Sequence, residues 1–172
     1  MLRFKKKHLI LFSLSIAIIA IAVFFIFPIY SLELRSFYED KVLFSQRVQP
    51  GDKFTLEYTH SVALTPVWEI FVIDQDYQII LVETDFLDHG AGLPYAAFDQ
   101  EIFVIEEGRF KIKNMQRIMR NPIYYRVGAN SNNCFYFKDN KINLSSLWGD
   151  RLLSIGIGKK NLFSFLKGRN FR

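Results

Sequence analysis

Two short stretches of the sequence hold the side chains best suited to chemistry, and the first is YTHSVALTPVWEIF, residues 58–71. It contains His60, Ser61 and Glu69. A serine nucleophile activated by histidine needs both side chains on one side, within hydrogen-bond reach. Residues 53–62 alternate between apolar and polar, which predicts a strand with His60 and Ser61 on opposite faces. This alternation, together with the lack of a GxSxG motif, argues against a serine hydrolase.

The second stretch is FLDHGAGLP, residues 86–94, which predicts an irregular loop. Its candidate site residues are His89, Gly90, Gly92 and Pro94. Glycine permits a positive φ or a close approach of the backbone to a ligand, and exposed backbone N–H groups can bind an anion. The alternative for this loop is a conformationally demanding connection between strands that binds nothing. His60 also has a structural alternative, because a histidine on the apolar face can be a core residue.

Histidine and carboxylate side chains across both stretches could also bind a metal ion. The candidate ligands are His60, Glu69, Glu83, Asp85, Asp88 and His89. Their spacing matches no established metal signature. A metal-dependent envelope hydrolase using His60, Glu69, Asp85 and His89 therefore stands as an alternative, and the leading interpretation has no metal, no cofactor and no catalytic residue.

Charge and cysteine content exclude other classes of protein. Nine of the 22 basic residues lie in segments 1–8 and 159–172, which contain no acidic residue, while all 17 acidic residues lie between them. The central domain is therefore weakly acidic, whereas a nucleic-acid-binding domain needs a basic face. The two basic ends suit a phospholipid surface. The single cysteine, Cys134, excludes an internal disulfide and a CxxC site, and its aromatic neighbours predict a buried thiol.

The N-terminal region predicts a membrane anchor. Residues 9–29 carry no charge, and 21 residues of helix span about 31 Å, close to the roughly 30 Å of a bilayer's hydrocarbon core. Basic residues precede this run, so the positive-inside rule places the N-terminus in the cytoplasm. A cleaved signal peptide with AIA at 20–22 is the alternative, but the apolar run continues beyond it. Either interpretation exports the rest of the chain.

Residues after Tyr30 alternate over short runs separated by turn residues, which predicts strands in 53–62, 67–74, 77–86, 101–115, 123–129, 134–144 and 151–157. One predicted hairpin turns at residues 74–76 and a second at Glu107–Gly108. We expect an all-β domain, a sandwich or partly open barrel of about eight to ten strands, preceded by a single transmembrane helix. The predicted parts are the cytoplasmic end and anchor at 1–30, the extracytoplasmic domain at 31–158 and a basic tail at 159–172. The tail could form a short helix on the membrane surface or a packed or frayed end.

The two stretches together resemble the DUF1850 family of small bacterial and archaeal proteins. The family pattern runs Tyr-x-His-Ser-Val, Pro-Val-x-Glu, Glu-x-x-Phe and Gly-Ala-Gly-Leu-Pro. The matching residues here are Tyr58, His60, Ser61, Val62, Pro66, Val67, Glu69, Glu83, Phe86, Gly90, Ala91, Gly92, Leu93 and Pro94. The resemblance covers roughly residues 45–157 and is loose in its later half.

Members of this family are often encoded beside TRAP transporters of the TAXI type, so the resemblance implies an exported accessory to solute uptake. We expect a non-enzymatic protein in which His60, Ser61, Glu69 and the 89–94 loop bind a small anionic ligand or a transporter partner. The expected partners are the membrane, the permease and the solute-binding protein. A purely structural envelope protein is the remaining alternative.

Overall fold

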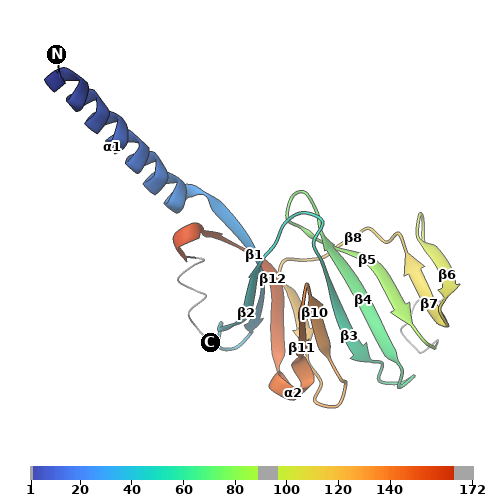
Figure 1. Ribbon diagram of the computed structural model, residues 1–172. Coiled ribbons are helices and arrows are strands. Elements are labelled where there is room, and N and C mark those ends of the chain that lie inside the picture. The colour runs from blue at the N-terminus through green and yellow to red at the C-terminus, as the bar shows by residue number, and fades with distance from the viewer. Residues whose placement is uncertain (1, 89–96, 165–172) are drawn as a thin grey trace. The chain divides into compact units, whose positions relative to one another are not determined.

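The computed structural model describes residues 2–88 and 97–164 (Figure 1). Within the first helix, the side chains of residues 2–7, 9–11, 20, 23 and 24 are outside this description. The elements are α1 (Leu2–Ile26), β1 (Pro28–Ser36), β2 (Val42–Arg47), β3 (Lys53–Thr59), β4 (Pro66–Ile73), β5 (Ile79–Phe86), β6 (Ile102–Glu106), β7 (Arg109–Lys113), β8 (Arg117–Ile118), β9 (Ile123–Arg126), β10 (Cys134–Phe137), β11 (Asn140–Asn143), α2 (Leu144–Trp148) and β12 (Leu152–Asn161).

The strands form two antiparallel sheets, which confirms the prediction of a mostly β domain (Figure 1). The smaller sheet has the order β2-β1-β12-β9, and the larger has the order β11-β10-β3-β4-β5-β7-β6, with β8 also paired to β5. Within the described residues neither sheet closes on itself. The twelve strands exceed the expected eight to ten, because β1, β2 and β8 were not predicted.

The hydrophobic core lies between the two sheets. On the larger sheet, Phe54 pairs with Phe71 across β3 and β4, and their rings stack at 4.7 Å between centroids. Phe44 of the smaller sheet contacts Phe135 of the larger, with ring centroids 5.6 Å apart. The core also takes in Cys134, whose prediction as a buried thiol is confirmed. Burial of several large side chains, each contributing about 2 kcal/mol, is the main stabilising term.

Helix α1 contains 25 residues and ends just before Pro28, because proline cannot donate the backbone hydrogen bond that would continue a helix. The last residues of the predicted 9–29 segment therefore belong to β1 instead. Several described apolar side chains of α1 are exposed, among them Phe12 and Ile18. Judged on the described side chains, no helix combines the length and hydropathy needed to cross a membrane.

The chain divides into two compact units, one formed by 1–31 with 158–172 and the other by 32–157. In the first unit, the rings of Phe25 and Phe163 lie 5.5 Å apart. Strand β12 continues to Asn161, so the first three residues of the predicted tail are in a strand. Residues 162–164 are helical, and the remainder of the tail lies outside the described residues.

The β6–β7 hairpin illustrates how turn chemistry sets the strand register. Glu107 and Gly108 connect the strands with φ values of 54° and 72°, and Glu106 pairs with Arg109. Two successive positive φ values define the type I′ turn, whose twist matches that of the flanking strands. The predicted turn at this position is thus confirmed.

We predict that Gly108→Ala lowers the free energy of unfolding by about 1 kcal/mol. A Cβ at Gly108 meets no atom within 4 Å, so the whole cost is conformational. Asparagine tolerates positive φ better than glutamate, and Glu107→Asn should therefore raise stability by a few tenths of a kcal/mol. Urea unfolding of the two variants measures both effects. Equal stability of Gly108→Ala and the native chain would contradict the proposed turn.

Candidate functional site

His60 closes the turn between β3 and β4. The strand ends at Thr59, so the predicted strand was three residues too long. The His60 amide donates to the carbonyl of Thr65 at 2.8 Å, and the Leu64 amide donates to the carbonyl of His60 at 2.9 Å. The imidazole Nδ1 accepts from the amides of Val62 at 3.2 Å and Ala63 at 3.0 Å. His60 therefore caps its own turn.

This geometry decides the chemistry of the imidazole. Nδ1 can accept two N–H groups only while it carries no proton, so the hydrogen of the neutral ring lies on Nε2. His60 is 8% exposed, whereas the neighbouring Ser61 is exposed. The two side chains lie in different environments, which agrees with the argument against a Ser–His pair. The reason is a hydrogen-bonded turn rather than continued strand alternation.

Glu69 lies on the inner face of the larger sheet, where apolar side chains dominate. The register pairs it with Leu56 on β3 and Thr84 on β5, and directly opposed residues share a face of the sheet. The carboxylate is half-buried and has no hydrogen-bond or ion-pair partner among the described residues. Burial raises the pKa of Glu69, because an apolar environment disfavours the ionised form.

Two tyrosines adjoin this carboxylate, and we call Tyr58, Glu69 and Tyr125 the Glu69 cluster. Tyr58 lies on the same face of β3, opposite Val67. Burial raises the pKa of Tyr58 to about 12, with a further contribution from the charge of Glu69. The pKa of Tyr125 is also raised, chiefly by burial, with contributions from Glu69 and then Tyr58. Tyr125 comes from β9 of the smaller sheet, so both sheets build the cluster.

Asn133 holds Tyr125 in position. Its Nδ2 donates to the hydroxyl of Tyr125 at 2.5 Å, and its Oδ1 accepts from the amide of Gly128 at 3.0 Å. Asn133 is 3% exposed and comes just before β10. Neither Tyr125 nor Asn133 was a predicted site residue. No pattern in the sequence links them to Glu69, because the contact depends on how the two sheets pack.

Asp85 lies on the opposite face of the larger sheet. It pairs with Trp68 on β4 and Lys111 on β7, whereas its neighbour Thr84 pairs with Glu69. Oδ2 of Asp85 lies 3.8 Å from Nζ of Lys111 and 3.9 Å from Nη1 of Arg109. The pKa of Asp85 is raised to about 6, chiefly by burial. A hydrogen bond to Glu83 and the negative charge of Glu83 also contribute to this increase.

The four proposed ligands of a metal-dependent hydrolase are therefore not assembled by the described part of the chain. Glu69 and Asp85 project from opposite faces of one sheet, and His60 uses Nδ1 to cap its turn. Within residues 2–88 and 97–164, no three His, Cys, Asp or Glu side chains group as metal ligands would. The remaining predicted site residues, His89, Gly90, Gly92 and Pro94, lie outside the described residues.

We predict that His60→Ala lowers the free energy of unfolding by about 1–2 kcal/mol, because two backbone N–H groups lose their acceptor. His60→Asn should cost less than half as much, since an asparagine Oδ1 can accept from the same two amides. Urea unfolding of the two variants provides the comparison. A loss with asparagine as large as that with alanine would show that the turn does not depend on the Nδ1 acceptor.

We predict that Asp85 makes stability depend on pH. Its pKa of about 6 in the folded chain exceeds the unfolded value of about 3.9, so the folded state holds the proton more tightly. This contribution is complete below pH 4 and is lost as pH rises toward 6. Asp85→Asn should therefore gain stability relative to the native chain between pH 4 and pH 7. Urea unfolding across this range measures the gain, with Asp76→Asn in an exposed turn as control.

Comparison with known proteins identifies the family. The family model described as Domain of unknown function (DUF1850) matches residues 54–144, more than half of the chain. No curated protein and no solved structure matches the chain. The matched region runs from β3 to the start of α2 and contains His60, the Glu69 cluster and Asp85. The chain therefore belongs to the DUF1850 family.

Proposed function

We propose that this protein is a membrane-anchored, extracytoplasmic binding protein that serves as a non-enzymatic accessory of a TAXI-type TRAP transporter. The uncharged segment at 9–29 and the basic residues before it support the anchor and its orientation. The exposed apolar side chains of α1 also favour a lipid environment. The transporter assignment is supported by the frequent proximity of family genes to such transporters.

The observation that supports a binding role is the carboxylate of Glu69, which has no hydrogen-bond or ion-pair partner among the described residues. A carboxylate on the apolar face of a sheet is costly unless hydrogen bonds or a counter-charge compensate for the lost water. The described residues supply neither to Glu69. A leucine at this position would pack against Leu56 without that cost. We infer that Glu69 is retained because a ligand or a partner completes it.

The chemistry of the Glu69 cluster indicates which group would complete it. The cluster presents one carboxylate and two phenol groups, and no lysine or arginine of the described residues pairs with Glu69. A positively charged group, or one rich in N–H donors, suits this set, because it can pair with the carboxylate and lie against the tyrosine rings. An ammonium or guanidinium on a transporter loop or on the transported solute meets this requirement.

From the sequence we expected an anionic ligand, and its binding would require the backbone amides of residues 89–94. Those amides would have to supply the positive potential, because the described cluster repels an anion. We therefore propose that Glu69 binds a positively charged group. Any anionic part of the ligand would bind elsewhere.

We predict that Glu69→Gln lowers solute uptake and co-purification of the permease about tenfold, because a charge-assisted hydrogen bond contributes roughly 1.5–3 kcal/mol. The same change should leave the free energy of unfolding equal or higher, since it removes a buried charge. Uptake of labelled solute and co-purification from membranes, at matched expression, are the measurements. Glu107→Gln, in the exposed β6–β7 turn, is the matched control.

A purely structural envelope protein would behave differently. In that case Glu69→Gln would leave uptake at the native level, or would lower uptake only in proportion to lost stability. Unchanged uptake after deletion of the gene, with no co-purification of permease or solute-binding protein, would refute the accessory role.

A further inference from the structure

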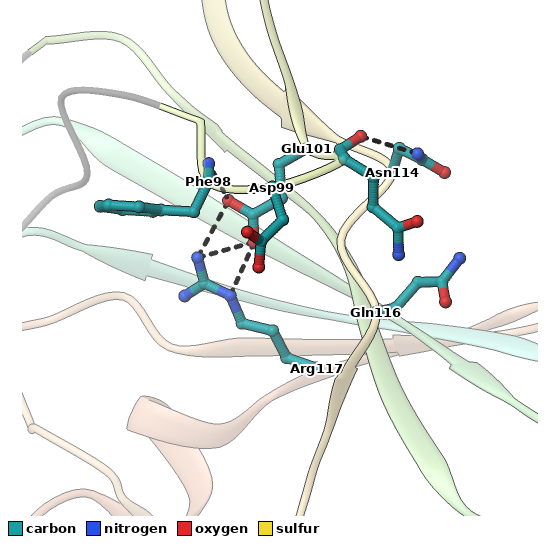
Figure 2. A pocket seen from close by; sticks show the side chains of 7 residues that line it. Phe98, Asp99, Glu101, Asn114, Gln116 and Arg117 are labelled. Carbon is teal, nitrogen blue, oxygen red and sulfur yellow. Dashed lines mark hydrogen bonds and ion pairs between the residues drawn. The ribbon is translucent and has the colours of Figure 1, made fainter.

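A small polar pocket lies beside the start of β6, separate from the residues of the Glu69 cluster (Figure 2). Its volume is about 250 Å³. Two segments build it, the 98–101 turn and residues 114–117, which run from the end of β7 into β8. The lining residues are Phe98, Asp99, Gln100, Glu101, Asn114, Gln116 and Arg117. Because a drug-sized ligand needs roughly 300–1,000 Å³, this pocket is sized for a smaller molecule.

Two interactions across the pocket hold its walls together. The guanidinium of Arg117 donates to Glu101 through Nε at 2.9 Å and through Nη2 at 3.1 Å (Figure 2). Glu101 also accepts from the amide of Phe98 at 3.2 Å, and its side chain is 8% exposed. Nδ2 of Asn114 donates to the carbonyl of Gln100 at 2.8 Å. The pocket is therefore formed before a ligand arrives, which lowers the entropy cost of binding.

The groups left available are a mixture of donors and acceptors. Among the described residues, the side chains of Asp99 and Gln116 have no hydrogen-bond or ion-pair partner, and Oδ1 of Asn114 accepts no bond. Arg117 retains donors at Nη1, and the ring of Phe98 is 63% exposed. The Glu101–Arg117 pair cancels its own charge, so Asp99 leaves the pocket weakly acidic.

This set of groups selects a class of ligand. Neighbouring hydroxyl groups each donate and accept, which matches carboxylate and carboxamide side chains presented together. The carboxylates disfavour an anion, and the polar lining disfavours an apolar molecule. A sugar ring, which is uncharged and carries several neighbouring hydroxyl groups, meets both requirements at a size suited to the pocket.

We propose that this pocket binds a single pyranose ring, either of a free sugar or at the end of a cell-envelope glycan. Asp99, Asn114 and Gln116 hydrogen-bond its hydroxyl groups. A ligand of about twelve heavy atoms should bind with a dissociation constant on the order of a millimolar.

The test is an NMR titration of the full chain in a detergent that lacks a sugar headgroup. The probes are glucose, galactose, mannose and N-acetylglucosamine, followed by the trimer of N-acetylglucosamine. The side-chain amide signals of Gln100, Asn114 and Gln116 report directly on the pocket. We expect at least one monosaccharide to shift them saturably. Gln116→Ala and Asp99→Asn should each weaken binding about fivefold or more, and asparagine tolerates the φ of 53° at position 99.

Gln75→Ala, in the exposed β4–β5 turn, is the matched control and should bind as the native chain does. Tighter binding of the trimer than of the monosaccharide identifies a glycan end, and equal binding identifies a free sugar. No saturable shift with any probe at 50-fold the expected dissociation constant overturns the proposal. Equal binding by Gln116→Ala, Asp99→Asn and the control overturns it as well.

Discussion

The register of β3, β4 and β5 is the constraint on which the rest of the domain depends. Because Leu56, Glu69 and Thr84 are directly opposed, alternate residues of β3 and β4 are assigned to one face. On β5 the alternation changes phase where the register shifts between Ile70 and Phe71 of β4. The Phe54–Phe71 stack follows from this assignment, and so does the position of Glu69 beside the core. A shift of one residue would exchange Glu69 with Trp68 and expose the aromatic core. The same register therefore places Glu69 on one face of the sheet and Asp85 on the other.

The same register gives two carboxylates different chemistry. Glu69, on the inner face, is disfavoured as an anion by burial and has no described counter-charge. Burial also disfavours Asp85 as an anion on the outer face, but Lys111 and Arg109 lie 3.8 and 3.9 Å from its Oδ2. The two carboxylates therefore differ in their cationic neighbours, which Asp85 has and which the described residues do not give to Glu69. This contrast is the reason for placing ligand binding at Glu69 rather than at Asp85.

Local patterns predicted much of the larger sheet. Alternation and turn residues located the β4–β5 and β6–β7 hairpins, because each depends only on residues close in sequence. Strand β1 was missed because its apolar start continues the apolar run of α1 without interruption. His60 was assigned to a strand because alternation extends through Val62, and only the hydrogen bonds to Nδ1 reveal the turn.

The sequence by itself determined the family, the mostly β class and the positions of two hairpins. These properties are local, since they depend on residue types within about fifteen positions. Only the tertiary structure decided that Tyr125 and Asn133 join Glu69, that Asp85 faces away from it and that residues 98–101 and 114–117 enclose a pocket. Such contacts depend on the register between strands and on the packing of two sheets, and no spacing along the chain encodes either one directly.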